Sequence, residues 1–307
     1  MAYFTERHGM RQPITQTSEI SLDKYSLLLS CCEQYYTHIA WKYPEECPDG
    51  RGCCGINTYK LAEDMRYEIP TLFKNDSGQI ERPREYHNVF SSEVIVDSYD
   101  QYSLLDFIEF IGFNCKDIRS KSHHSYYGHD DLQFSENNTS AERFREDINA
   151  IFRKTGLLYV YNEDGLIERV IPNSVVTEEV VASVAAVSEP GLKELLETAI
   201  ALHKSPHPAD HKNAVEKLWD AFERLKTYYT TLNKKQSAEK IVNDMASSDT
   251  NYVNLFDAEF KALTTIGNTY RIRHHETDKI DITDDKHYDY FFNRCLSVIA
   301  LAIQYLN

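Results

Sequence analysis

The chain has 307 residues, of which 42% are apolar, so it is long enough for two ordinary domains with hydrophobic cores. Its net charge is −15, from 33 Lys plus Arg against 48 Asp plus Glu, and such a surface repels nucleic acid outside a local basic cluster. No stretch approaches the ~18 consecutive apolar residues of a membrane-spanning helix, and residues 1–20 lack the apolar run of a signal peptide. We therefore expect a cytoplasmic protein with no membrane partner.

The first half of the chain alternates helical patterns with short strand patterns. Helices are predicted at residues 21–41, 58–67, 103–113 and 139–154, and strands at residues 89–97, 157–161 and 166–171. Ser103 is expected to cap the third helix, and Thr139 with Glu142 has the three-residue offset of a capping box at the fourth. The last two strands are joined by Asn-Glu-Asp-Gly, which is typical of a hairpin because its Gly165 tolerates positive φ.

After Pro172 the pattern becomes almost entirely helical. Helices are predicted at about residues 191–203, 209–231, 236–246, 252–266 and 286–306. The last of these is apolar on more than one side, so it is either central in its bundle or pairs with a second copy of the chain. We expect a mainly helical α+β protein, with an N-terminal α+β domain at residues 1–175 and a C-terminal helical bundle at residues 176–307.

The predicted helix 209–231 buries one stripe and carries an acidic row on another face. Its apolar stripe comprises Val215, Leu218, Phe222, Leu225 and Tyr229. The acidic row comprises Glu216, Asp220 and Glu223, with Lys212, Lys217 and Arg224 spaced to pair with it. A solvated acidic face is the favoured interpretation. In the alternative, Glu216 or Asp220 turns inward and orients a cation across the bundle.

Residues 267–277, with the sequence GNTYRIRHHET, form a local basic cluster in this acidic chain. Arg271, Arg273, His274 and His275 fall within five positions. Cleavage of RNA without a metal needs a group of near-neutral pKa to move protons, and a fixed cation to stabilise charge on the phosphate oxygens. Histidine and arginine supply these functions. Arg271 and His275 share a face if the segment is helical. The alternative is structural, with each side chain bound to carbonyls or carboxylates.

Three further histidines, His203, His207 and His211, are spaced by four residues. Pro206 and Pro208 preclude a regular helix through them. We expect these histidines to be exposed.

Two stretches contain residue types that bind metals. The chain has seven cysteines, an odd number that favours free thiols, and residues 47–55 (CPDGRGCCG) resemble a zinc loop without paired Cys-x2-Cys knuckles. The other stretch is residues 119–131, which contains His123, His124, His129, Asp130 and Asp131. No regular spacing preorganises it, so a polar loop is favoured over a metal site, and we expect neither a metal nor another cofactor.

Several segments resemble a known family. YFTERHGM at residues 3–10, GHDDL at 128–132, FREDIN at 144–149 and GLLY at 156–159 resemble the N-terminal domain of bacterial AbiJ-type abortive-infection proteins. AVEKLWDAFERLK at residues 214–226 and the segment 266–279 are similar to the C-terminal region of the same group. That region is HEPN-like: a small helical bundle, usually dimeric, and often a metal-independent ribonuclease in phage defence.

The resemblance implies roles for the basic cluster. Arg273 would stabilise the phosphate of an RNA substrate with help from Arg271, and His274 or His275 would act as general acid and base. Glu216 or Asp220 would orient the arginine or the histidine. A homodimer through the C-terminal helices is also implied.

The HEPN nuclease signature, an arginine followed after a longer interval by a histidine, is not matched by this cluster. Arg119 with His124 and Arg82 with His87 have that spacing but lie in the other domain. The remaining alternative is a non-catalytic dimeric sensor or adaptor that binds RNA, a nucleotide or a partner protein.

Overall fold

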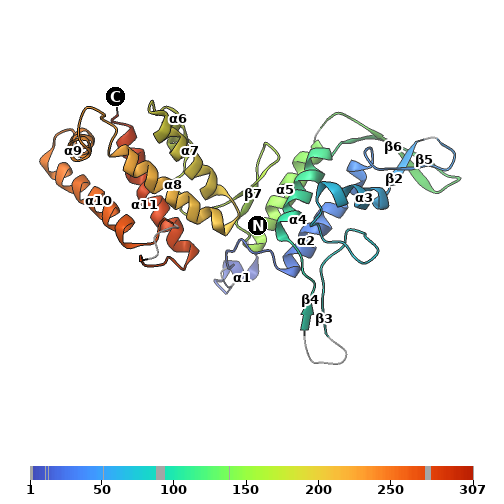
Figure 1. The fold of residues 1–307 in the computed structure, drawn as a ribbon. Coiled ribbons are helices and arrows are strands. Elements are labelled where there is room, and N and C mark those ends of the chain that lie inside the picture. The colour runs from blue at the N-terminus through green and yellow to red at the C-terminus, as the bar shows by residue number, and fades with distance from the viewer. Residues whose placement is uncertain are drawn as a thin grey trace. The chain divides into compact units, whose positions relative to one another are not determined.

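The computed structural model describes residues 3–306 except 11, 13, 51, 88–93, 138 and 274–277. The chain divides into two compact units, Met1–Arg169 (unit 1) and Val170–Asn307 (unit 2). The sequence analysis places the boundary a few residues later, after residue 175. Figure 1 shows the fold and labels most of the elements.

Unit 1 is built around a hydrophobic core formed by its longer helices. Its helices are α1 (Phe4–Arg7), α2 (Leu22–Gln34), the 3-10 helix η1 (Tyr36–Ile39), α3 (Thr58–Glu68), α4 (Gln101–Asn114) and α5 (Thr139–Thr155). Leu28, Phe107 and Phe144, one from each of α2, α4 and α5, are fully buried in this core. The four predicted helices of this half are confirmed, although the first ends at Gln34 and continues as η1.

The predicted caps of α4 and α5 are wrong. Asp100, not Ser103, caps α4 by accepting a hydrogen bond from the Tyr102 N–H at 2.9 Å. At α5, Asp117 from a neighbouring segment accepts the Ser140 N–H at 2.6 Å, and Thr139 is already the first residue of the helix rather than its cap. In both cases a carboxylate outside the expected position satisfies the first free N–H groups of the helix.

Unit 1 also carries three small antiparallel sheets. The largest has the order β1-β2-β6-β5, with β1 (Pro44–Glu46), β2 (Cys53–Ile56), β5 (Ile118–His124) and β6 (His129–Phe134). The other two are β3 (Glu85–His87) with β4 (Val94–Val96), and β7 (Tyr159–Tyr161) with β8 (Ile167–Arg169). The three predicted strands are confirmed as β4, β7 and β8, and Gly165 in the hairpin loop has φ +77°.

Residues 119–131, predicted as a polar loop, belong instead to the β5–β6 hairpin. Gly128, at φ +71°, closes its turn, where the Gly128 N–H donates to the His124 carbonyl at 2.9 Å. Both strands are rich in polar residues, so no apolar alternation marked them as strands.

Unit 2 is a bundle of helices. These are α6 (Glu178–Ala185), α7 (Pro190–Lys204), α8 (Pro208–Leu225), α9 (Lys234–Met245), α10 (Thr250–Thr269) and α11 (Asp285–Ile303). They confirm the predicted helices of the second half and, with unit 1, the mainly helical α+β class. Among the described residues, none of the helices has the length and apolarity needed to span a bilayer.

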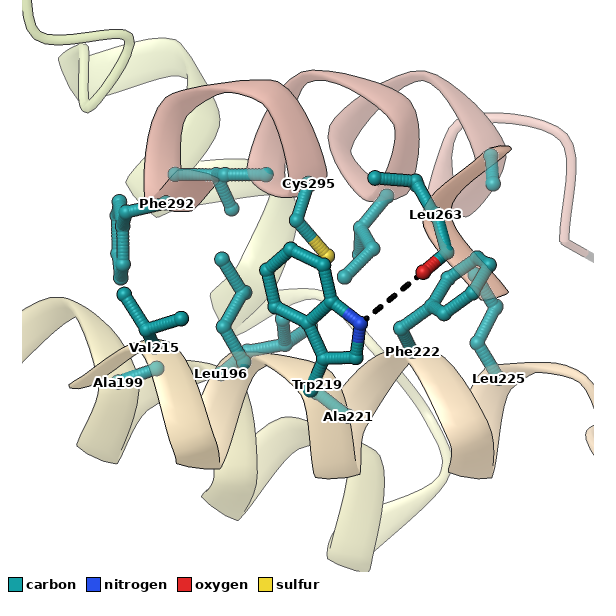
Figure 2. Close-up of a cluster of buried hydrophobic side chains, with 14 of the residues drawn as sticks. Leu196, Ala199, Val215, Trp219, Ala221, Phe222, Leu225, Leu263, Phe292 and Cys295 are labelled. Carbon is teal, nitrogen blue, oxygen red and sulfur yellow. Dashed lines mark hydrogen bonds between the residues drawn. The ribbon is translucent and has the colours of Figure 1, made fainter. Parts of the chain in front are cut away.

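The core of unit 2 lies between α7, α8, α10 and α11 (Figure 2). The predicted α8 stripe is buried, with Val215, Leu218 and Phe222 inaccessible to solvent. The Trp219 indole N–H donates to the Leu263 carbonyl of α10 at 3.2 Å. The α11 residue Phe292 is also fully buried, so α11 occupies a central place in its own bundle.

Two of the three spaced histidines are buried, which contradicts the expected exposure. His203 and His211 are 1% and 3% exposed, whereas His207 is exposed. The prolines do interrupt the helix, but the last turn of α7 and the first turn of α8 both face the core. The His203 ring stacks on Phe292, with a centroid separation of 3.6 Å, so it acts as an aromatic core residue.

Candidate functional site

The basic cluster begins where α10 ends, on backbone that the structure describes up to Arg273. Tyr270 forms an isolated parallel bridge with Ile280, and the Arg271 N–H donates to the Ile280 carbonyl at 2.8 Å. Ile272 is buried in the core of unit 2 and holds the segment against the bundle. Residues 271–273 are not helical, and His275, predicted to share a helical face with Arg271, lies outside the described residues.

Arg273 is held by Asp220 of α8. Its Nη2 and Nε lie 3.1 and 3.3 Å from Asp220 Oδ1, and the two side chains are 33% and 35% exposed. One carboxylate oxygen thus fixes the guanidinium, while a third of its surface remains open to solvent. Such an arginine can bind a phosphate oxygen without first moving into position.

Arg271 has a different partner. Its Nη1 donates to Asp281 Oδ1 at 2.8 Å, so it connects the segment after α10 to the segment before α11. The hydrogen bond and positive charge of Arg271 lower the pKa of the Asp281 carboxyl. The Arg271 Nε is buried and has no hydrogen-bond partner among the described residues. Arg271 therefore braces the loop that carries Arg273.

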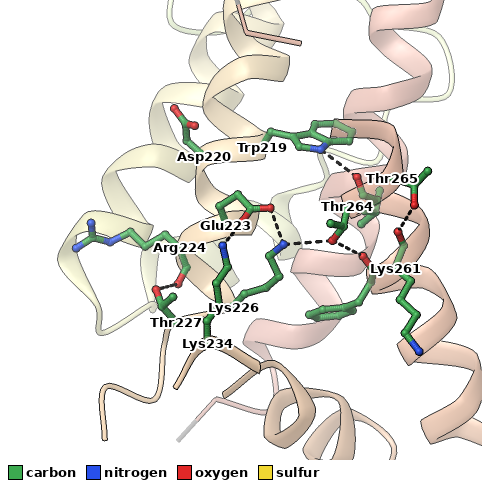
Figure 3. A network of polar contacts seen from close by, with 12 residues as sticks. Trp219, Asp220, Glu223, Arg224, Lys226, Thr227, Lys234, Lys261, Thr264 and Thr265 are labelled. Carbon is green, nitrogen blue, oxygen red and sulfur yellow. Dashed lines mark hydrogen bonds and ion pairs between the residues drawn. The ribbon is translucent and has the colours of Figure 1, made fainter. Parts of the chain in front are cut away.

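The acidic row of α8 is not a uniformly solvated face. Beyond Asp220, Glu223 accepts hydrogen bonds from Lys226 at 2.5 Å and from Lys234 at 2.6 Å (Figure 3). Burial raises the pKa of Glu223, but these two hydrogen bonds outweigh burial and leave the pKa below its usual value. In Figure 3 the Asp220 carboxylate stands apart from this lysine network.

One of the predicted ion pairs along α8 is also replaced. Arg224, expected to pair with the acidic row, instead binds Glu189, with both nitrogen–oxygen distances at 2.7 Å. Glu216, the other candidate orienting residue, lies one turn before Asp220 and is half-buried. His274 and His275 lie outside the described residues and follow Arg273 directly in the chain.

Residues able to hold a metal gather in unit 1. Cys47, His124, His129 and Asp131 each offer a ligand atom, and these atoms all lie within 4.8 Å of one another. The set combines Cys47 of the cysteine loop with residues of the histidine-rich stretch, which lie more than 70 residues further along the sequence. His123 is not part of it, since it binds the exposed Asp130 at 3.0 Å.

Comparison with known proteins bears on unit 1. The family model described as AbiJ N-terminal domain 4 matches residues 2–185, which include unit 1 and α6. Searches of curated proteins and of solved structures found no match. AbiJ domains are parts of abortive-infection proteins, so the match indicates a protein of phage defence. Because the match covers more than half of the 307 residues, the chain belongs to the AbiJ family through its AbiJ N-terminal domain 4.

Proposed function

We propose that this abortive-infection protein is a HEPN-type ribonuclease that cleaves RNA without a metal at the Arg273 cluster of unit 2. The observation that supports it most is the Arg273–Asp220 pair: a guanidinium held at one edge, open at another, and followed directly by two histidines. A positioned cation and a group that carries protons are the two requirements of metal-independent phosphodiester cleavage.

The proposed reaction needs only these groups. His274 or His275 accepts the proton of the ribose 2′-hydroxyl, and the 2′-oxygen attacks phosphorus as the bond to the 5′-oxygen breaks. Arg273 binds the non-bridging oxygens as their charge grows. A protonated histidine returns a proton to the leaving 5′-oxygen, so the products carry a 2′,3′-cyclic phosphate and a 5′-hydroxyl. Arg271 acts as a positioning residue through Asp281.

We further propose a homodimer through the C-terminal helices. Tyr252 and Leu255 of α10 and Tyr290 of α11 are more than half exposed, and large apolar side chains gathered on one bundle favour association. Light scattering of the wild type should give twice the mass of one chain, and Leu255→Glu should give the mass of one chain. A monomeric wild type would contradict the dimer.

Cleavage of a labelled RNA tests the proposed activity. Arg273→Ala and the double variant His274→Ala, His275→Ala should each lose at least about a hundredfold in rate, the scale of losing a charge-stabilising group or an acid-base group. Arg119→Ala is the matched control, because Arg119 is exposed in unit 1 and has a histidine at the family spacing. An inactive wild type, or loss of activity in Arg119→Ala alone, would refute the assignment.

The rival function is a non-catalytic sensor in which the same arginine is structural. A structural role predicts a large loss of stability in Arg273→Ala, because it would strand a buried carboxylate. The observed one-third exposure of Asp220 favours the catalytic role, since exposed pairs contribute at most about 1 kcal/mol. Thermal unfolding of Arg273→Ala should therefore shift by only a few degrees.

A further inference from the structure

Four side chains of types that bind zinc converge at one end of the β1-β2-β6-β5 sheet of unit 1. Cys47 directly follows β1, His124 ends β5, and His129 begins β6. His124 and His129 are cross-strand partners, and Asp131, two residues after His129, shares its face of the sheet. Three strands thus bring the ligand atoms within 4.8 Å of one another.

Two distances within this group match those expected around a tetrahedral ion. The Cys47 Sγ lies 3.5 Å from His124 Nδ1, and His129 Nε2 lies 3.3 Å from Asp131 Oδ1. Zinc bonds of about 2.0–2.3 Å place neighbouring ligand atoms roughly 3.3–3.8 Å apart. A small inward movement of the side chains therefore completes the coordination.

Two buried atoms of the group make no hydrogen bond within the described part of the chain. His129 Nε2 and Asp131 Oδ1 are buried, and neither makes a hydrogen bond with any described residue. Their contact with each other is an ion pair only if the imidazole is protonated, and a cation between them would satisfy both atoms. With Cys47 as thiolate and Asp131 as carboxylate, a divalent ion makes the site neutral, which suits its partial burial.

A histidine that binds a metal through one ring nitrogen usually has a polar partner at the other, and Asp49 is that partner for His124. Its Oδ2 lies 3.4 Å from His124 Nε2, on the opposite side of the ring from Nδ1. Its Oδ1 accepts the Cys47 S–H at 2.8 Å. When the metal binds, the thiol proton passes to solvent and Asp49 continues to orient His124.

The sheet also needs such support. Among the described residues, none of the β5–β6 hairpin belongs to the hydrophobic core of unit 1. Small elements without a core are commonly held by a metal. We therefore propose that Cys47, His124, His129 and Asp131 bind one Zn²⁺, a closed structural site that fastens the two hairpins of the sheet. This proposal does not rest on the ribonuclease proposal.

Metal analysis of the full chain, expressed without a His tag, tests the site. We expect about one zinc per chain after dialysis against zinc and then buffer, and less than a tenth of that in Cys47→Ser and His129→Ala. Cys54→Ser and His123→Ala are matched controls, from the adjacent β2 strand and from the other face of the hairpin, and should retain zinc. A zinc-free wild type, or equal loss in the controls, would overturn the proposal.

A second measurement uses the wild-type chain alone, in case a variant does not fold. Titration with Co²⁺ should give the visible bands of a tetrahedral ion and a thiolate charge-transfer band, and zinc should displace both. Removing the metal should also accelerate amide exchange in β1, β2, β5 and β6 while α2, α4 and α5 stay protected. Absence of the cobalt bands, or unchanged exchange, would contradict a bound metal.

Discussion

At the scale of single residues, the contact between Arg273 and Asp220 is the centre of the proposed cleavage site. Only one oxygen of Asp220 receives both hydrogen bonds from the guanidinium, at 3.1 and 3.3 Å. The contact orients the arginine without enclosing it, because both side chains are about one-third exposed. Asp220 should therefore matter more for the position of Arg273 than for the folding of unit 2.

Asp220→Ala tests this division. We expect RNA cleavage to fall by about tenfold or more, since a loosened arginine loses its preorganised position, while the free energy of unfolding changes by at most about 1 kcal/mol. Urea unfolding measured beside the cleavage rate separates the two effects. A variant that is fully active, or one that is unfolded, would contradict the positioning role.

Glu189 gives a prediction for pH. It caps α7 by accepting the Leu192 N–H at 2.6 Å, and its hydrogen bonds with Arg224 lower its pKa from 4.5 to about 2. A folded-state pKa below the unfolded value stabilises the fold at pH above about 4.5, and this contribution is lost as pH falls towards 2. Glu189→Ala should lower the free energy of unfolding by about 1 kcal/mol near neutral pH, because α7 loses its cap.

The wild type should then lose more stability than Glu189→Ala between pH 5 and pH 2, and the two should converge at the acid end, because protonated Glu189 no longer binds Arg224. Glu197→Ala, an exposed acid on the same helix, serves as the control and should follow the wild type. If the free energies of unfolding of the wild type and of Glu189→Ala changed in parallel with pH, the stabilising role of ionised Glu189 would be contradicted.

Residue roles were only partly predictable from the sequence. Asp220 is a candidate because of its place in an acidic row, but nothing in the sequence distinguishes it from Glu216, the other candidate. Cys47 and Asp131 lie in separate stretches of the sequence, and nothing there marks Asp49 as part of a site. A register in which β2 pairs with β6 brings them together, and long-range strand pairing leaves no local sequence signal.

At the scale of elements, Trp219 determines how closely α8 and α10 pack (Figure 2). Gly267 lies one turn after Leu263 on α10, and a Cβ at Gly267 would lie 2.6 Å from Trp219 Nε1 and 2.7 Å from Cδ1. The absence of a side chain at Gly267 therefore makes room for the indole and for its hydrogen bond.

Gly267→Ala should destabilise unit 2. Alanine gains about 1 kcal/mol of helix propensity over glycine, but overpacking costs about 1–3 kcal/mol and the indole loses its bond to the Leu263 carbonyl. Asn268→Ala, at the next and exposed position, is the control and should be neutral or slightly stabilising. A Gly267→Ala chain as stable as the wild type in urea would contradict this packing.

Amphipathic helices were predictable and the polar hairpin was not. The stripe from Val215 to Leu225 repeats every three or four residues, and burial follows that period directly. The hairpin of β5 and β6 has mostly exposed or half-buried side chains, so hydrophobic alternation could not reveal it. Caps supplied from elsewhere in the chain, such as Asp117 at α5, escape local patterns for the same reason.

At the scale of the whole molecule, the family match covers unit 1 and α6, whereas the proposed cleavage site lies outside the matched residues. AbiJ N-terminal domain 4 accounts for residues 2–185, whereas Arg273 and its partner lie in unit 2. Unit 1 carries the proposed zinc site, and unit 2 the proposed cleavage site. The two sites should therefore be separable: Cys47→Ser should lose zinc, while the proposed cleavage of RNA at the basic cluster should be retained.

The chemistry of the RNA ends tests the central claim most directly. Fragments produced by the wild-type chain, without added metal and in the presence of a chelator, should carry 2′,3′-cyclic phosphate and 5′-hydroxyl ends, and none should appear with the His274→Ala, His275→Ala variant. Fragments with 5′-phosphate ends that form only when a divalent metal is added would contradict a metal-independent site built on Arg273.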